Sequence, residues 1–384
     1  MKRFWKRAMI MILVLFLLYP ALPMKKASAK VSVSAESAIL MDQTSGRVLF
    51  RKDIHKKMRI ASITKVMTAI LAIESGKMDE TVKISSNAVG TEGSSIYLKK
   101  GERIKLKDLV YGLMLRSGND AAVAIAEKVG GSADGFVYLM NKKAHELGML
   151  DTHFSNPHGL DGKNFTHYST AYDMALLTKY AMKNEQFRKI FKTKFHSVPQ
   201  EGEDWPRSWK NKNKLLFRYD YSTGGKTGFT KLARRTLIST ASKDDLNLIT
   251  VTLNDGDDWK DHMNLFNWGF KTFDMTTIVK KGKISGIKSK FYKNHLYAHR
   301  DLSLPLTNNE QKALSTEMDL YQPPKNGKWE NPPSPIGKLY VKWGDKELAQ
   351  LPLFYHKPPK KKEHGFWTLF KQVFLSALRI DVND

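Results

Sequence analysis

The hydrophobic and polar positions between residues 34 and 273 alternate between strand-like and helix-like patterns. Apolar residues on both sides of a turn at 43–46 predict two short strands within 37–53. Apolar residues with helical spacing follow, and after them come two runs rich in Thr, Ile, Leu and Val that read as paired strands. The predicted helices cover 62–73, 109–129 with an interruption at 117–119, 132–147 and 170–183, and the late strands cover 234–242 and 247–253. Because the helices lie between early and late strands, we expect an α+β fold with an antiparallel sheet whose first and last strands meet.

The pattern changes twice towards the C-terminus. From 275 to 355, short apolar pieces lie among Gly, Pro and Lys, which predicts a small β-rich domain. From 356 to 384, a basic Pro-Lys hinge precedes a run with one wide apolar face and a polar face that includes Lys371 and Arg379. This predicts an amphipathic helix that anchors the protein to an anionic membrane surface, and a helix docked on the protein itself is the alternative. The two charges disfavour a spanning helix in so short a segment.

The first 29 residues read as a secretory signal peptide. A basic start is followed by an apolar run from 8 to 18 and by a small-x-small cleavage pattern at 27–29. An uncleaved anchor is the alternative, although the apolar run is short for one. Removing these residues takes away six basic residues and lowers the formal net charge from +25 to +19. We therefore expect an exported protein whose first folded domain covers 30–274, held at the outer face of the cytoplasmic membrane.

Charge and cysteine content limit the function classes further. A basic chain suits nucleic acid, anionic lipid or an anionic cell-wall polymer, and export argues against nucleic acid. The chain contains no cysteine, which excludes disulfide bonds and thiol chemistry.

Ser62 and Lys65 are the first candidates for chemistry. They lie three positions apart at the start of an apolar helical run, so the lysine amine can reach the serine hydroxyl. A serine needs a base to become a nucleophile, and a lysine can be that base if burial or nearby cations lower its pKa. The spacing alone is common, however: Ser285 and Lys288 repeat it in a Lys-rich segment that we expect to be exposed.

Two later motifs make the first one more specific. Residues 117–119 read Ser-Gly-Asn in a helix interruption, and residues 226–228 read Lys-Thr-Gly, which occurs once in the chain. Residues 85–87 also read Ser-x-Asn, but they follow Ser62 too closely to lie beyond a separate helix. Taken in order, the three motifs resemble the serine D,D-peptidases, or penicillin-binding proteins. Longer stretches resemble the D-alanyl-D-alanine carboxypeptidase branch of that family, and they cover most of the chain.

The resemblance implies a catalytic domain with an antiparallel sheet flanked by helices, followed by a small β domain and an amphipathic anchor. It also implies that Ser62 attacks the penultimate D-Ala carbonyl of a peptidoglycan stem peptide and forms an acyl-enzyme, while Lys65 acts as general base. Ser117 would relay a proton to the leaving amine, and Asn119 would hold the substrate amide and help to fix Lys65. Penicillins would be covalent inhibitors, and no metal or cofactor is needed.

The Lys-Thr-Gly strand would form one wall of this site. Lys226 and Thr227 would bind the terminal carboxylate, with the charge of Lys226 also keeping Lys65 neutral. Gly228 would leave room for the substrate backbone. The backbone N–H groups of Ser62 and Phe229 would form the oxyanion hole.

Neighbouring polar residues receive structural roles. His158 and His167 are expected in turns or caps, and Asp161 and Asp173 in a loop or at a helix start. The pair 234–235, Arg-Arg, follows the Lys-Thr-Gly strand, where it binds a carboxylate or is simply solvated.

Three alternative functions are left open. A class A β-lactamase would have Asp in place of Gly118 and a deacylating Glu, whereas the segment 156–173 contains no Glu. A penicillin sensor or a wall-binding protein would keep the pocket without turnover. Within the family, Thr223 stands where many members have an Asp, and the chain most resembles the sporulation-type carboxypeptidases.

Overall fold

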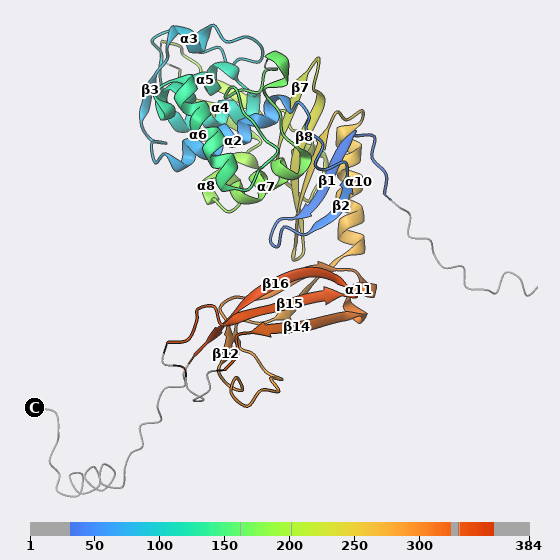
Figure 1. The fold of residues 1–384 in the computed structure, drawn as a ribbon. Helices are drawn as coiled ribbons and strands as arrows, with labels where there is room; N and C mark the ends of the chain where they lie inside the picture. The colour runs from blue at the N-terminus through green and yellow to red at the C-terminus, as the bar shows by residue number, and fades with distance from the viewer. Residues whose placement is uncertain (1–30, 162, 201, 324–328, 330, 357–384) are drawn as a thin grey trace, which may run out of the picture. The chain divides into compact units, whose positions relative to one another are not determined.

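The computed structural model describes residues 31–161, 163–200, 202–323, 329 and 331–356 (Figure 1). The predicted signal peptide and the predicted amphipathic helix lie outside these residues. Within the described part of the chain, no helix is both long and apolar enough to cross a membrane.

The first domain is built on a five-stranded antiparallel sheet. Its strands, in spatial order, are β2 (Val48–Lys52), β1 (Ser37–Asp42), β9 (Leu246–Leu253), β8 (Arg234–Lys243) and β7 (Ser222–Thr230). Ser37 lies opposite Leu253, and Asp42 lies opposite Leu248. The prediction that the first and last strands of this domain meet is therefore confirmed.

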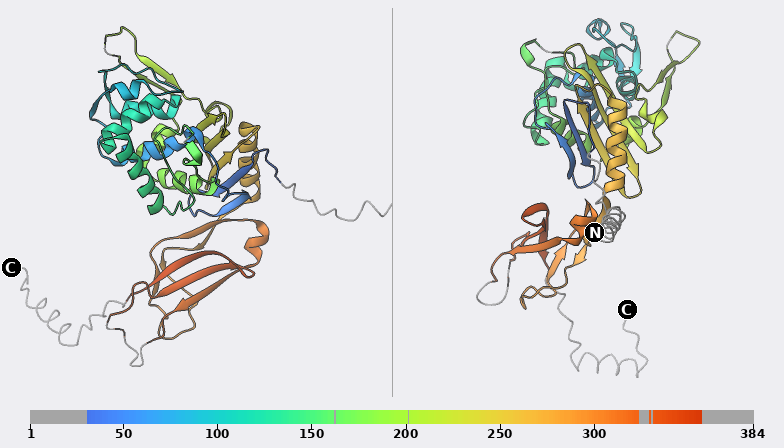
Figure 2. Two further views of the ribbon diagram at one scale, coloured as in Figure 1. Left: turned by 45° about the horizontal axis from the view of Figure 1, so that its top comes forward. Right: turned by 90° about the vertical axis from the view of Figure 1, so that its right-hand side faces the viewer.

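Helices cover both faces of this sheet, as Figures 1 and 2 show. The helices of one face are α2 (Lys65–Glu74), α4 (Leu106–Arg116), α5 (Asn119–Gly130), α6 (Ala133–Glu146), α7 (Ala171–Ala181) and α8 (Glu185–Phe191). The other face is covered by α10 (Asp258–Thr272). Two hairpins, β3 (Thr81–Lys83) with β4 (Arg103–Lys105) and β5 (Phe195–Val198) with β6 (Arg207–Lys210), and the short helices α3 (Ser86–Val89) and α9 (Leu215–Arg218) complete the domain.

The helix α2 runs through the centre of the hydrophobic core. All of its residues from Lys65 to Ile73 are buried, as expected of a helix that is apolar almost all round. Its surroundings include Leu109 and Leu113 of α4 and Ile125 of α5 in the same core cluster. The one lysine of this helix therefore lies in a site that is poorly suited to a charge.

The sequence prediction missed the helices α3, α8, α9 and α10 and the hairpins β3–β4 and β5–β6. Helix α10 carries Asp258, Lys260 and Asp261 in its first turns, so its apolar stripe is short, and it is recognisable only from the buried Leu265 and Phe266. The predicted helices and strands are otherwise present, and the predicted interruption separates α4 from α5.

The second domain has its own core. One sheet has the strand order β11 (Gly282–Lys283), β12 (Leu296–Ala298), β16 (Lys346–Tyr355), β15 (Gly337–Trp343) and β14 (Leu314–Leu320), and β10 (Asp274–Val279) pairs with β13 (Leu302–Leu306). Buried apolar residues such as Leu304, Val341 and Leu353 form a cluster separate from that of the first domain. The predicted β-rich fold is confirmed, with the addition of one short helix, α11 (Asn308–Lys312). The predicted domain boundaries stay predictions.

Candidate active site

Ser62 lies in a tight turn that leads into α2. Residues Ala61–Thr64 form a 3-10 turn, and Ala61 has a φ of 48°, a left-handed conformation that is costly for a residue with a Cβ. The loop around Gly159 packs directly on this turn. A Cβ on Gly159 would lie only 2.0 Å from the Ala61 carbonyl oxygen. The same loop lies next to the Ser62 side chain, whose Oγ is 3.5 Å from the His158 carbonyl oxygen.

Lys65 contacts three oxygen atoms. Its Nζ lies 2.9 Å from Ser62 Oγ and 2.7 Å from Asn119 Oδ1, and it donates to the backbone carbonyl of His158. The orientation of the Asn119 amide is set by its other end, because Nδ2 donates to the Glu92 carbonyl at 2.6 Å. The predicted contact between Ser62 and Lys65 is therefore present, and Asn119 reaches the same amine.

Burial explains how Lys65 can act as a base. Burial, followed by the charges of Lys226 and Lys212, lowers the pKa of Lys65 well below its ordinary value. A neutral amine has two N–H donors and one lone pair. The oxygens of Asn119 and His158 can only accept, so they take the two N–H groups. The lone pair then remains for the hydroxyl proton of Ser62.

Ser117 and Asn119 occupy the break between α4 and α5. Ser117 ends α4 in the left-handed region, with φ 65° and ψ 33°, and Asn119 is the first residue of α5. Both side chains are buried. The break turns the serine hydroxyl towards the sheet, where it accepts a hydrogen bond from Lys226 Nζ at 3.0 Å.

Strand β7 supplies Lys226, Thr227 and Gly228 as the opposite wall. Lys226 is fully buried, and burial together with the charge of Lys212 lowers its pKa to about 7. A Cβ on Gly228 would lie 2.4 Å from Thr236 Oγ1 and 2.9 Å from the backbone nitrogen of Ser62. Glycine is therefore needed for the close approach of β7 to the Ser62 turn itself, a reason that the substrate-based prediction had not included.

His167 supports the Ser62 turn through Thr64. Its Nδ1 accepts from the Ser155 backbone N–H at 3.0 Å, which places the ring proton on Nε2, 2.8 Å from Thr64 Oγ1. Thr64 in turn donates to the Ala61 carbonyl at 2.8 Å. Burial lowers the pKa of His167 to about 3, so the ring stays neutral. The side chain has the predicted structural role, whereas the contribution of the His158 carbonyl to Lys65 was not predicted.

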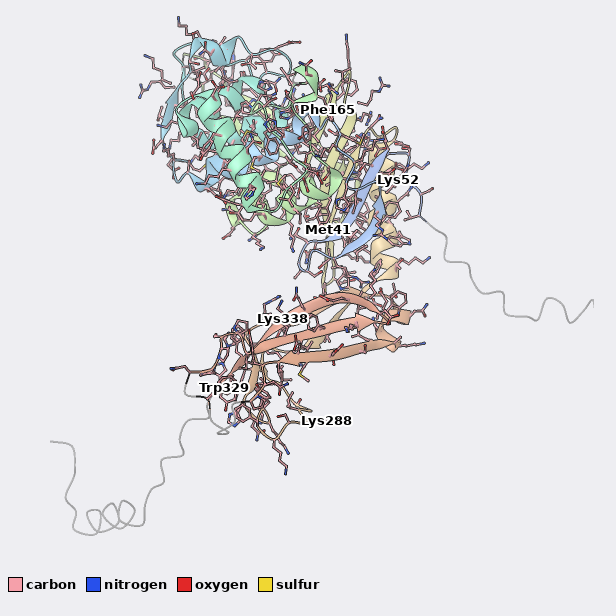
Figure 3. All side chains as sticks on the ribbon, in the orientation of Figure 1. Met41, Lys52, Phe165, Lys288, Trp329 and Lys338 are labelled. Carbon is pink, nitrogen blue, oxygen red and sulfur yellow. The ribbon has the colours of Figure 1, made fainter. Side chains whose placement is uncertain are left out.

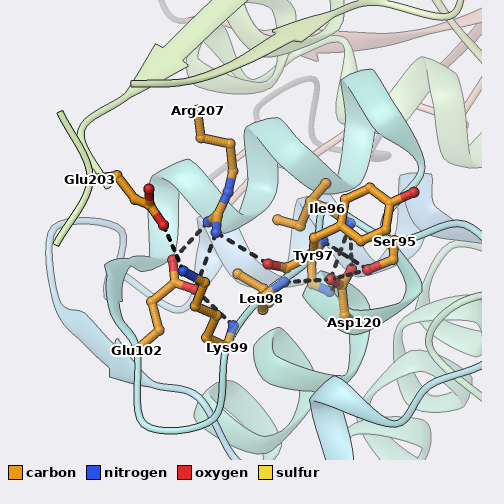
Figure 4. Close-up of polar contacts among 10 residues, drawn as sticks. Ser95, Ile96, Tyr97, Leu98, Lys99, Glu102, Asp120, Glu203 and Arg207 are labelled. Atoms are coloured by element: carbon orange, nitrogen blue, oxygen red, sulfur yellow. Dashed lines mark hydrogen bonds and ion pairs between the residues drawn. The ribbon is translucent and has the colours of Figure 1, made fainter. Parts of the chain in front are cut away.

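Asp120 anchors the loop of residues 94–98, which contributes Ser94 to the lining of the pocket beside Ser62 (Figure 4). Its Oδ2 accepts from Ser95 Oγ at 2.6 Å and from the Leu98 backbone N–H at 3.1 Å, and Oδ1 accepts from the N–H of Ile96 at 3.1 Å. The same loop contributes the Ser94 carbonyl, which accepts from the Asn119 backbone N–H at 2.6 Å. Asp120 therefore links the loop to the helix start that carries Asn119.

A second link ties this loop to the β5–β6 hairpin. Arg207 pairs with Glu102 at 2.7 Å and donates to the Tyr97 carbonyl at 3.2 Å. Lys99 reaches Glu203 of the hairpin at 2.8 Å, in a more exposed ion pair (Figure 4). The polar contacts at this border of the pocket thus range from the buried ones of Asp120 to the exposed pair of Lys99 and Glu203.

We expect Asp120→Asn to lower the free energy of unfolding by about 1–3 kcal/mol, because the amide group would face N–H donors that need an acceptor. Urea unfolding of the purified protein measures this. Asp134→Asn is the matched control, since Asp134 is an exposed residue in the first turn of α6. An equal, small change in both variants would contradict the anchoring role of Asp120.

Ser62, Ser117, Thr227 and Gly228 border a pocket of about 320 Å³, whereas the buried Lys65, Asn119 and Lys226 do not line it. Its lining residues are Ser62, Ser94, Ser117, Lys212, Thr227, Gly228, Phe229, Arg235, Asp258 and Trp259. Lys212 donates to Ser94 Oγ at 3.2 Å, and Arg235 pairs with Asp258 at 2.5 Å. Sequence reasoning had missed Ser94, Lys212, Asp258 and Trp259, because no motif marks them, and had left Arg235 undecided. The second match, Ser285 and Lys288, is exposed and does not line this pocket. Figure 3 labels Lys288 in the β-rich domain.

Comparisons with known proteins agree with this geometry. Residues 24–257 match the family model of D-alanyl-D-alanine carboxypeptidase, and residues 273–360 match that of the C-terminal domain of penicillin-binding protein 5. The D-alanyl-D-alanine carboxypeptidase DacF of Bacillus subtilis is 31% identical over 372 residues, which cover 90% of this chain and 93% of the relative. DacA of Escherichia coli K12 is 36% identical over 65% of this chain and 64% of its own length. The crystal structure of penicillin-binding protein 5 from Haemophilus influenzae superimposes with a TM-score of 0.72 at 27% identity, covering 86% of this chain and 98% of the other.

Proposed function

Since the chain belongs to the D-alanyl-D-alanine carboxypeptidase family of serine hydrolases, we propose that Ser62 is the nucleophile that removes the terminal D-Ala from peptidoglycan stem peptides. The observation that carries this assignment is the contact of the Ser62 hydroxyl with a buried lysine whose two other partners are pure acceptors.

Acylation begins with the transfer of the Ser62 proton to the lone pair of Lys65. Ser62 Oγ then attacks the carbonyl carbon of the penultimate D-Ala, and the carbonyl oxygen becomes an oxyanion. The backbone N–H groups of Ser62 and Phe229 bind that oxyanion, with about 3 kcal/mol of stabilisation per donor in comparable sites. Ser117 passes the proton on to the leaving nitrogen, the C–N bond breaks, and free D-Ala departs.

Binding of the substrate C-terminus uses β7. A protonated Lys226 attracts the terminal carboxylate, and the Thr227 hydroxyl donates a hydrogen bond to it. The Asn119 amide contacts the substrate amide. In the second half-reaction a water molecule gives its proton to Lys65 and attacks the acyl carbon. The bond between that carbon and Ser62 Oγ then breaks, Lys65 returns the proton to Oγ, and the shortened peptide leaves with a new carboxylate.

Penicillins would acylate the same serine and remain attached. Gly118 and the absence of Glu from residues 156–173 leave the chain without the groups that a class A β-lactamase uses for rapid deacylation. A penicillin sensor without turnover is the second candidate. It would have the same pocket, so the rate of deacylation separates the two.

We also propose that the enzyme works outside the cytoplasm, attached to an anionic membrane surface through residues 356–384. The basic, amphipathic composition of that segment supports this placement. The sporulation-type assignment rests on the overall resemblance, and expression confined to vegetative growth would contradict it.

The test is the release of free D-alanine from a peptide that ends in Lys-D-Ala-D-Ala. Release together with covalent labelling by penicillin supports the carboxypeptidase. Labelling without release, on soluble peptide and on intact cell wall alike, supports the sensor instead.

The expected pH dependence of the reaction follows from Lys226. Lys226 must be charged to bind the carboxylate, and its pKa of about 7 means that it loses this charge as the pH rises through 7. We therefore expect kcat/KM for the peptide to fall on the alkaline side of pH 7. In Lys226→Arg the guanidinium stays charged, so the alkaline limb should move to higher pH. Lys231→Arg, an exposed lysine beyond the same strand, is the control, and an unmoved limb in an active Lys226→Arg variant would contradict the role of Lys226.

A further inference from the structure

We propose that Arg235 is a specificity-determining residue that binds a carboxylate of the stem peptide, upstream of the two D-alanines. This inference rests on the proposed function, because it needs the terminal D-Ala to lie at Lys226 and Thr227. It assigns a substrate contact to the far end of the same pocket.

The strand register places Arg235 at that end. Strands β7 and β8 are antiparallel, with Gly228 opposite Thr236 and Phe229 opposite Arg235. Directly opposite residues share one face of a sheet. Arg235 therefore faces the pocket beside Phe229, and both line it together with Asp258 and Trp259.

The direction of the substrate follows from the proposed contacts. Its carboxylate lies at Thr227, and its scissile carbonyl lies at the N–H of Phe229. These two residues are two positions apart on an extended strand, or about 7 Å. The residues that precede the scissile bond therefore continue past Phe229, towards Arg235, Asp258 and Trp259.

The guanidinium is held in place but keeps free donors. Its Nη2 donates to Asp258 Oδ1 at 2.5 Å, and the carboxylate of Asp258 is itself buried and also accepts from the Trp259 backbone N–H at 2.9 Å. The Arg235 side chain keeps 43% of its surface exposed, while its Nε is buried and makes no hydrogen bond within the protein. An arginine has five N–H donors in a plane, and one carboxylate cannot satisfy them all.

A carboxylate is the group that matches this arrangement. It accepts two parallel hydrogen bonds from a guanidinium, and the partner that fixes the plane of the arginine reduces the side-chain freedom lost on binding. The stem peptide offers such a group on a diaminopimelate-type third residue or on the γ-linked glutamate before it. Both share the same chemistry, so the experiment must distinguish them.

The experiment compares three peptides that all end in D-Ala-D-Ala. The first has an acylated lysine before the D-alanines, the second has diaminopimelate at that position, and the third has lysine preceded by γ-linked glutamate with a free α-carboxylate. We measure kcat/KM of D-alanine release for the parent, Arg235→Gln, Arg235→Lys and the control Arg234→Gln. Arg234 is the exposed neighbour in the same strand and does not line the pocket.

We expect the parent to prefer at least one carboxylate-bearing peptide by about tenfold over the neutral one, as a charge-assisted hydrogen bond allows. Arg235→Gln should lose that preference and keep its rate on the neutral peptide, Arg235→Lys should retain part of it, and Arg234→Gln should match the parent. The peptide that shows the effect identifies the source of the carboxylate. An equal loss on all three peptides, or no preference in the parent, overturns the proposal. Release from the neutral peptide together with penicillin labelling tests the proposed function separately.

Discussion

Ser62→Ala is expected to lower kcat for D-alanine release by about four to six orders of magnitude, the range found when a serine nucleophile is removed from a serine hydrolase. The loss is large because Lys65, Asn119 and the strand wall act on one hydroxyl, and none of them offers another atom that can form the acyl bond. The same variant should no longer be labelled covalently by penicillin. Single-turnover release and mass spectrometry of the penicillin adduct measure both effects.

The chain contains its own control for this experiment. Ser285→Ala changes the serine of the second Ser-x-x-Lys match, which is exposed in the β-rich domain. Its rate and its penicillin adduct should equal those of the parent. A penicillin adduct that persists in Ser62→Ala would place the nucleophile elsewhere.

Lys65→Arg is expected to reduce acylation by about 10²–10⁴-fold, the usual contribution of a general base. An arginine stays protonated in proteins, so it replaces the neutral amine of Lys65 with a charged donor that has no lone pair for the Ser62 proton. Lys65→Met removes the amine with little change in length, and it should show a similar loss. The rate of penicillin acylation, followed over pH, reports this step without the later hydrolysis.

Folding must be checked in both Lys65 variants, because Lys65 is buried at the centre of the domain. Circular dichroism and thermal unfolding show whether the core survives. Lys288→Arg, in the exposed second match, is the matched control. A folded Lys65→Met protein that acylates at the parental rate would show that another group takes the proton.

The local patterns of apolar and polar residues predicted most of the helices and strands of the first domain. The apolar run that begins at Ser62 and the Ser-Gly-Asn interruption are short-range signals, and the structure has a buried helix and a helix break at these places. The family resemblance added the expectation that Ser117 and Lys226 belong to one site, and the structure has these two side chains in direct contact. What these residues do in the reaction is still a prediction.

Contacts between distant segments could not be predicted in the same way. The His158 carbonyl reaches Lys65 across 93 positions, and any residue type has such a carbonyl. Arg235 and Asp258 meet only because β8 and the start of α10 converge in space. Helix α10 itself was missed because its charged first turns conceal a short apolar stripe. The sequence therefore indicates functional groups that belong to side chains, but it cannot indicate which backbone carbonyl or N–H groups take part in a site.

The pairing of β1 with β9 affects how the enzyme folds during its synthesis. Ser34 Oγ, just ahead of β1, donates to Asp255, which lies 221 positions later and just beyond β9. The Ser62 turn is among the first parts to be synthesised, yet the strand next to β1 is among the last parts of the domain. Contacts of such long sequence separation form slowly, because the closure of a long loop must precede them. The Ser62 site is therefore complete only after the whole domain has emerged, so a chain that is interrupted before β9 should have no hydrolytic activity on the cell wall.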